Sequence, residues 1–139
     1  MAAAWEAELV SARRLTAFAE RVADNSARAR LLVLAAFCRA HASRILARLS
    51  ALGRLPLPVP DEDVGEDEPL REGLRKEARE ARAAADRYEE MADLARTQAD
   101  LSSAWVCELN RSEEEDLYLE LGRLAEAGLG EIARPRSII

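Results

Sequence analysis

One proline-rich segment divides this chain into two halves, and its length constrains how the halves can pack. Residues 53–68 begin at Gly53 and contain Pro56, Pro58 and Pro60, and proline lacks the N–H that a continuing helix needs. Adjacent antiparallel helices need only about two to eight connecting residues. An extended segment rises about 3.1 Å per residue, so this one can cross the whole length of a helical bundle. We therefore expect a long crossover that starts the next helix parallel to the previous one, and the alternative is a loose loop in an up-and-down bundle.

Apolar residues spaced by three and four predict two helices on each side of this segment. The chain is 49% hydrophobic but only 4% aromatic, and strand-forming runs are absent. The group Asp24-Asn25-Ser26 and Asp100 can each cap the start of a helix. The helices are predicted over about residues 3–23 and 27–52, over 69–98, and from Asp100 to about residue 126.

The predicted fold is all-α: one domain, a four-helix bundle of two similar antiparallel hairpins. The hairpins span residues 3–52 and 69–127, with the linker over 53–68 and a flexible tail over 128–139. Trp5 and Trp105 are expected to anchor the core, and Cys38 and Cys107 to be reduced, buried thiols.

Charge is unevenly divided between the two halves. The net charge is -6, yet residues 1–55 carry nine arginines against four acids, whereas residues 56–139 carry eleven basic residues against twenty-two acids. An acidic chain without a clustered basic face is not expected to bind nucleic acid. The sequence contains no apolar run of the roughly 20 residues that cross a bilayer, and its start lacks a basic segment followed by an apolar one. We expect a cytoplasmic protein that does not enter membranes.

Five polar or sulfur-containing residues are predicted on or beside the inward faces of these helices. Glu8 interrupts the apolar row of the first helix and His41 that of the second, in which Cys38 also lies. If the first hairpin turns near residue 25, Glu8 lies within about one helical turn of His41. On the fourth helix Glu113 is predicted to face inward between leucines, and Asp116 lies one turn further on.

These positions resemble a known family. The stretch from Phe18 through residues 35–42, and again residues 88–95 leading to 113–116, is similar to the two halves of a rubrerythrin-type ferritin-like domain. The resemblance implies that each half offers one glutamate on its first helix and Glu-x-x-His on its second, and that the halves together bind two iron atoms that reduce peroxide or oxidise ferrous iron.

This chain departs from that pattern in both halves. Cys38-x-x-His41 stands at the first Glu-x-x-His, and either Glu113-x-x-Asp116 or, by an ungapped match, Glu114-x-x-Leu117 stands at the second. For the first-helix glutamates, Glu8 or Glu6 matches in half one. In half two the match falls on Ala81, with Glu77 and Glu80 nearby.

The candidate metal ligands are therefore His41, Glu8, Glu113, Cys38 and Asp116, which would hold a single iron or zinc ion. The alternative for His41 is a hydrogen-bonded core residue paired with Glu8 or Glu113, and for Cys38 plain packing. We expect no bound cofactor and a non-catalytic role as a structural or interaction module. The alternatives are a metal-binding protein with a remodelled site and oxidoreductase activity, and a helical adaptor unrelated to the family.

Two features predict partners. The second helix is apolar around much of its circumference between Leu31 and Phe37, and such a helix must be covered on several sides. A homodimer would cover it. The last residues, 135–139, end in two isoleucines that are predicted to dock on the bundle or on a protein partner.

Overall fold

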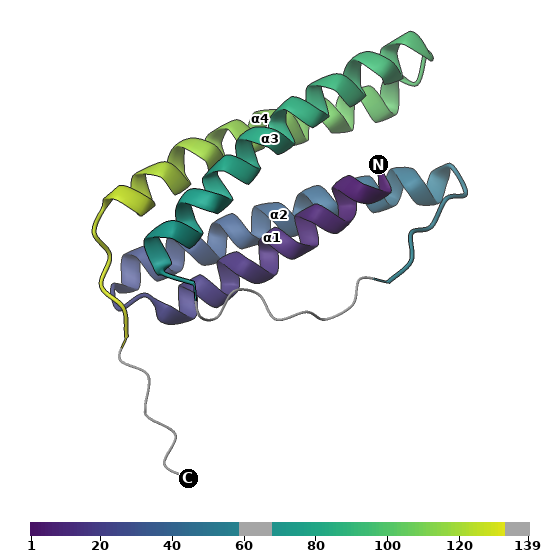
Figure 1. Ribbon diagram of the computed structural model, residues 1–139. Coiled ribbons are helices and arrows are strands. Elements are labelled where there is room, and N and C mark those ends of the chain that lie inside the picture. The colour runs from purple at the N-terminus through teal and green to yellow at the C-terminus, as the bar shows by residue number, and fades with distance from the viewer. Residues whose placement is uncertain (59–67, 133–139) are drawn as a thin grey trace.

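The computed structural model describes residues 1–58 and 68–132 and contains four helices (Figure 1). They are α1 (Ala2–Arg21), α2 (Asn25–Ala51), α3 (Leu70–Thr97) and α4 (Leu101–Glu126). α1 packs closely on α2 and α3 on α4, which confirms the predicted all-α bundle of two hairpins. No helix in the described part of the chain is long and apolar enough to cross a membrane.

Local sequence signals set the helix boundaries. The Asp24 carboxylate accepts a hydrogen bond of 2.8 Å from the backbone N–H of Ala27, and Asp100 accepts one of 3.1 Å from Ser103. Both aspartates cap the helix that follows, as predicted. Gly53 follows α2 with a φ of 70°, in the left-handed region that glycine occupies without strain.

Contacts between the hairpins show the predicted crossover. Arg30 near the start of α2 pairs with Glu120 near the end of α4, and Arg48 near the end of α2 pairs with Asp100 before α4. α2 and α4 are therefore antiparallel, and because α4 is antiparallel to α3, α3 runs parallel to α2. α3 begins at the opposite end of the bundle from the end of α2 (Figure 1). Linker residues 59–67 lie outside the described residues.

The start of α3 is held against α1 by a buried ion pair. Arg14 on α1 donates to the Glu77 carboxylate on α3, and its other branch lies 2.7 Å from Glu68, which precedes α3. Arg14 and Glu77 are 9% and 4% exposed. Burial raises the pKa of Glu77 even though Arg14 opposes this effect. The pair fixes the position at which the crossover ends.

The chain after α4 contacts the turn between α1 and α2. The Gly130 carbonyl accepts a hydrogen bond of 2.9 Å from Ala23, and the Ile132 N–H donates to the Arg21 carbonyl at 2.8 Å. The first part of the predicted flexible tail, to residue 132, is thus hydrogen-bonded to the first hairpin. Residues 133–139, including the predicted partner-binding end, lie outside the described residues.

Two apolar clusters form the core, with a polar layer between them. One contains Leu15, Phe18, Leu31, Leu74 and Leu121 near the α1–α2 turn. The other lies toward the opposite end, where the hairpins diverge (Figure 1), and contains Ile45, Leu49, Tyr88, Ala92 and Cys107, with Trp5 packed against it. The expected anchoring role of Trp105 is wrong, because its side chain is 65% exposed.

Two glycines inside helices make a matched stability test. A Cβ at Gly73 would lie 2.5 Å from the ring of Phe18, which is fully buried, whereas one at Gly122 would meet nothing within 4 Å. Alanine favours a helix over glycine by about 1 kcal/mol. Gly73→Ala should nevertheless destabilise the protein, because overpacking costs about 1–3 kcal/mol. Gly122→Ala should stabilise the protein. Urea unfolding measures the free energy of unfolding of both variants, and a change of the same sign in both would contradict the close contact between Gly73 and Phe18.

Candidate metal centre

Three buried side chains from three helices meet in the polar layer of the core. His41 on α2 places Nδ1 3.2 Å from Glu8 Oε2 on α1 and 3.2 Å from Glu114 Oε1 on α4. The three residues are at most 3% exposed. Their ligand atoms all lie within 4.8 Å of one another, and among the described residues they are the set of three metal-ligating side chains that meets this condition.

A second ring of side chains orients this cluster. The Tyr88 hydroxyl donates to Glu8 Oε1 at 3.0 Å. His41 Nε2 lies 3.2 Å from Glu113 Oε1, and this carboxylate oxygen also accepts a hydrogen bond from Arg44. The far nitrogen of the imidazole is thus fixed by a carboxylate, an arrangement common for histidines that ligate metals.

Asn110 completes the layer on α4. Its Oδ1 accepts from Arg44 at 3.1 Å, and its Nδ2 lies 3.4 Å from the backbone carbonyl of His41. Asn110 is fully buried, so these partners satisfy an amide that would otherwise be costly to bury. The layer therefore joins the two hairpins through hydrogen bonds and ion pairs.

The cluster holds exchangeable protons near neutral pH. Burial alone would lower the pKa of His41, but its hydrogen bonds to Glu114 and Glu8 and their negative charge raise that pKa to about 9. Burial raises the pKa of Glu114 well above its usual range, and the neighbouring Glu8 carboxylate adds to this effect. Burial opposes ionisation of Glu8 too, yet hydrogen bonds from His41, Glu114 and Tyr88 lower its pKa. At pH 7 His41 is positive, Glu8 negative and Glu114 neutral.

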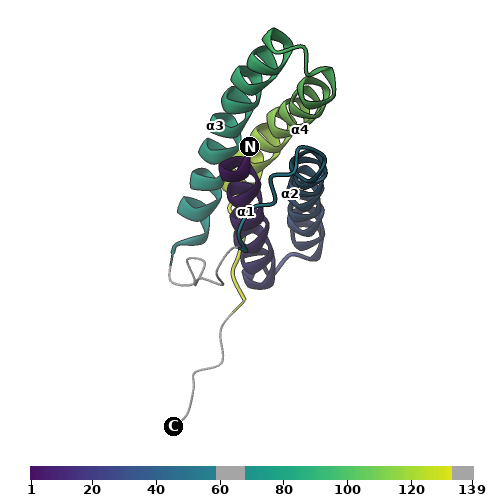
Figure 2. The same ribbon diagram turned by 90° about the vertical axis from the view of Figure 1, so that its right-hand side faces the viewer.

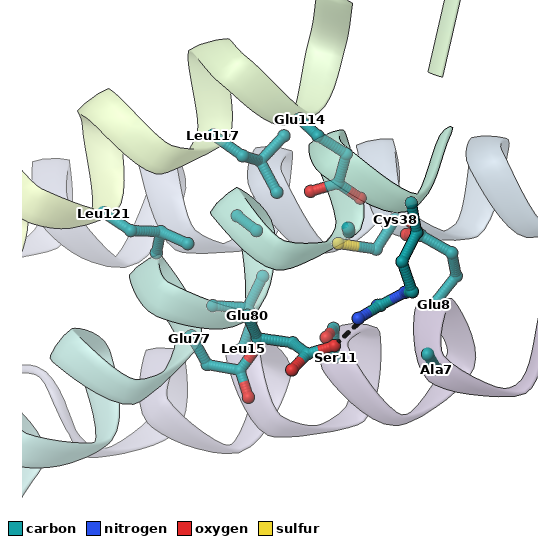
Figure 3. Close-up of a pocket in the computed structure, with 13 residues that line it drawn as sticks. Ala7, Glu8, Ser11, Leu15, Cys38, Glu77, Glu80, Glu114, Leu117 and Leu121 are labelled. Atoms are coloured by element: carbon teal, nitrogen blue, oxygen red, sulfur yellow. Dashed lines mark hydrogen bonds and ion pairs between the residues drawn. The ribbon is translucent and has the colours of Figure 1, made fainter. Parts of the chain in front are cut away.

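Cys38 borders the cluster without joining it. It lies one turn before His41 and lines a cavity of about 10 Å³ together with Glu8 and Glu114 (Figure 3). Such a space accommodates about one water molecule. Burial and the neighbouring Glu8 and Glu114 raise the pKa of the Cys38 thiol. Cys38 and Cys107 are both free, buried thiols.

The structure distributes the other predicted ligands differently. Glu113 contacts the outer nitrogen of His41 and is partly exposed, while Asp116 is exposed on the outer face of α4. The prediction that Glu113 is the inward-facing glutamate of α4 is wrong by one position. The buried row includes Asn110 and Glu114 instead. Each step along a helix turns the side chain by about 100°, so this one-residue shift exchanges Glu113 for Glu114.

Sequence reasoning also missed Tyr88, Asn110 and Arg44 as partners of the cluster. Tyr88 is buried on α3, and its hydrogen bond to Glu8 joins residues 80 positions apart, which no local pattern reveals. The available signal was the ungapped alignment within the ferritin-like resemblance, which pointed to Glu114. An exposed carboxylate run and an inward glutamate look alike in a single sequence.

The donor set suits one divalent transition-metal ion. Two carboxylates and an imidazole are ligands that zinc, iron and manganese all accept. At the matching place in the second hairpin, Ala81 is buried and offers no ligand, and the nearby Glu77 carboxylate is paired with Arg14. In the part of the chain described here, the residues thus form half of the ligand set expected for two iron atoms. Comparison with protein-family models, with curated proteins and with solved structures finds no match to this chain, so the ferritin-like resemblance stays a prediction.

Proposed function

We propose that this chain is a non-catalytic helical-bundle module that binds one divalent transition-metal ion, zinc or iron, at Glu8, His41 and Glu114. The observation that carries the proposal is the convergence of these three buried ligand groups on one point. Their donor atoms come from both hairpins. A bound ion would therefore link the two hairpins and stabilise their packing against each other, and with it the outer surface of the bundle.

Charge balance supports a divalent ion at this place. Two carboxylates in a buried site repel each other unless a cation or a proton lies between them. In the metal-free cluster this role falls to the proton on His41 Nδ1 and the proton held by Glu114. An ion of charge +2 that displaces both protons leaves the net charge of the cluster unchanged.

The second candidate is a metal-free scaffold or adaptor with the same residues as a hydrogen-bonded core layer. It is favoured by the observation that His41, Glu8 and Glu114 satisfy one another, with Tyr88 as a further donor. Such buried networks are costly if one member is removed and specify how helices pack. The two candidates share a fold and differ in whether a metal replaces the protons.

Metal titration of the full chain separates the candidates. With zinc or ferrous ions, calorimetry should give one site per chain, and the melting temperature should rise because only the folded form holds all the ligands. If two protons are displaced, the affinity should rise about 100-fold per pH unit below pH 9. Release of those protons can be measured from the dependence of the binding heat on the buffer.

Substitutions on α4 supply the matched control. Glu114→Gln should lower the affinity by more than the roughly 10–100-fold that loss of an outer partner costs. Glu115→Gln, on the exposed face of the same helix, should leave it unchanged. Absence of binding, with a melting temperature that added metal does not move, would refute the metal site and leave the scaffold candidate.

A further inference from the structure

A partly apolar groove runs between α2 and α4, on the side of the bundle away from α1 and α3. Both helices lie along this side in Figure 2. The groove has a volume of about 480 Å³. Its apolar walls include Val33, Phe37 and Leu119, whose side chains are 42%, 39% and 54% exposed. Contiguous exposed apolar surface of this kind marks interaction sites.

The two helices that border the groove carry opposite charge. α2 has five arginines and no acidic residue, whereas α4 has seven acidic residues and two arginines. Within one chain, Arg30 on α2 pairs with Glu120 on α4 across the groove. At the groove itself, Arg30 lies on the α2 side, and Glu113, Asp116 and Glu120 lie on the α4 side beside Arg123, with apolar side chains between them.

We propose that the α2–α4 face binds a second copy of the chain through a two-fold axis, with α2 of each copy against α4 of the other. A two-fold interface uses the same patch on both subunits, so the patch must complement itself. A positive α2 side next to a net negative α4 side meets this requirement when one copy is rotated by 180° about an axis parallel to the two helices. The rotation also places the apolar strip of one copy on that of the other.

The same pattern of charge disfavours other occupants. Nucleic acid would be repelled by the three acidic residues of α4 that line the groove. The interface lies outside the Glu8–His41–Glu114 cluster, so dimer formation does not require a bound ion.

Sedimentation of the full chain over a wide concentration range tests the dimer. The expected species at high concentration has twice the 15.3 kDa chain mass. Phe37→Glu on α2 and Leu119→Arg on α4 should each weaken the dimer by more than about tenfold, because each places an unpaired charge in the apolar strip. Trp105→Ser removes an apolar side chain that is 65% exposed outside the groove and should leave the dimer intact.

Mixing the two variant chains tests the arrangement of the helices. In the mixed dimer, the new glutamate on α2 of one chain faces the new arginine on α4 of the other, and the second α2–α4 contact is unchanged. The mixture should therefore dimerise although each variant alone does not. Three results would each overturn the proposal. The wild-type chain could stay monomeric, the dimer could be lost in Trp105→Ser but kept in Leu119→Arg, or the mixture of the two variants could form no dimer. Circular dichroism of each variant confirms folding, and the more exposed Leu119 keeps the test valid if Phe37→Glu unfolds.

Discussion

Replacing His41 with alanine should lower the free energy of unfolding of the metal-free protein by about 3–5 kcal/mol at pH 7. His41 is fully buried and faces Glu8 and Glu114 through one ring nitrogen. Its removal leaves two buried carboxyl groups without their cation and a space in the core. Ser43→Ala, on the exposed face of the same helix, should change stability by no more than about 0.5 kcal/mol.

The same substitution should change the pH dependence of stability. The pKa of His41 is about 9 in the folded protein against a usual value of 6.5. Between these values the His41 site of the folded state binds more protons than that of the unfolded state. The stability that His41 contributes is therefore fully present below pH 6.5 and is lost as the pH rises towards 9. The loss from His41 amounts to about 3 kcal/mol over this range. Urea unfolding at several pH values measures this loss of stability. If the free energy of unfolding of His41→Ala fell with pH as steeply as that of the wild type, the role assigned to the imidazole would be contradicted.

Replacing Arg14 with leucine should have a comparable effect at a separate place in the core. Arg14 neutralises the buried Glu77 carboxylate, and its guanidinium lies 5.3 Å from the centre of the Phe18 ring. Removing one partner of a buried pair costs about 3–5 kcal/mol because the other charge is left without compensation. Unfolding of Arg14→Leu in guanidinium chloride should show this loss in the free energy of unfolding.

A double variant separates the loss of the pair from the loss of packing. In Arg14→Leu/Glu77→Leu both charges are absent, and apolar replacements of a buried pair are often close to neutral. The double variant should therefore be more stable than Arg14→Leu alone. Destabilisation equal to the sum of the two single variants would show that the two side chains act independently.

The sequence determined most of the architecture of this protein. Asp24, Asp100 and Gly53 act through their immediate neighbours along the chain, so the helix ends are readable within about two residues. The long proline-containing linker predicted a crossover, and the ends of α2 and α3 lie as that prediction expects. The proximity of Glu8 and His41 could be predicted because both belong to one hairpin. The position of its turn determines which residues of the two helices lie side by side.

Tertiary packing alone decided the composition of the cluster. The rotation of α4 about its axis depends on the helices it contacts, and leucines and acids alternate along it too evenly to fix that rotation from sequence. Glu114 enters the core, Glu113 contacts its edge, and Asp116 is exposed. The hydrogen bond from Tyr88 and the raised pKa values of His41 and Glu114 follow from burial and from neighbours distant in sequence. These properties depend on distances between helices, which no local pattern of residues encodes.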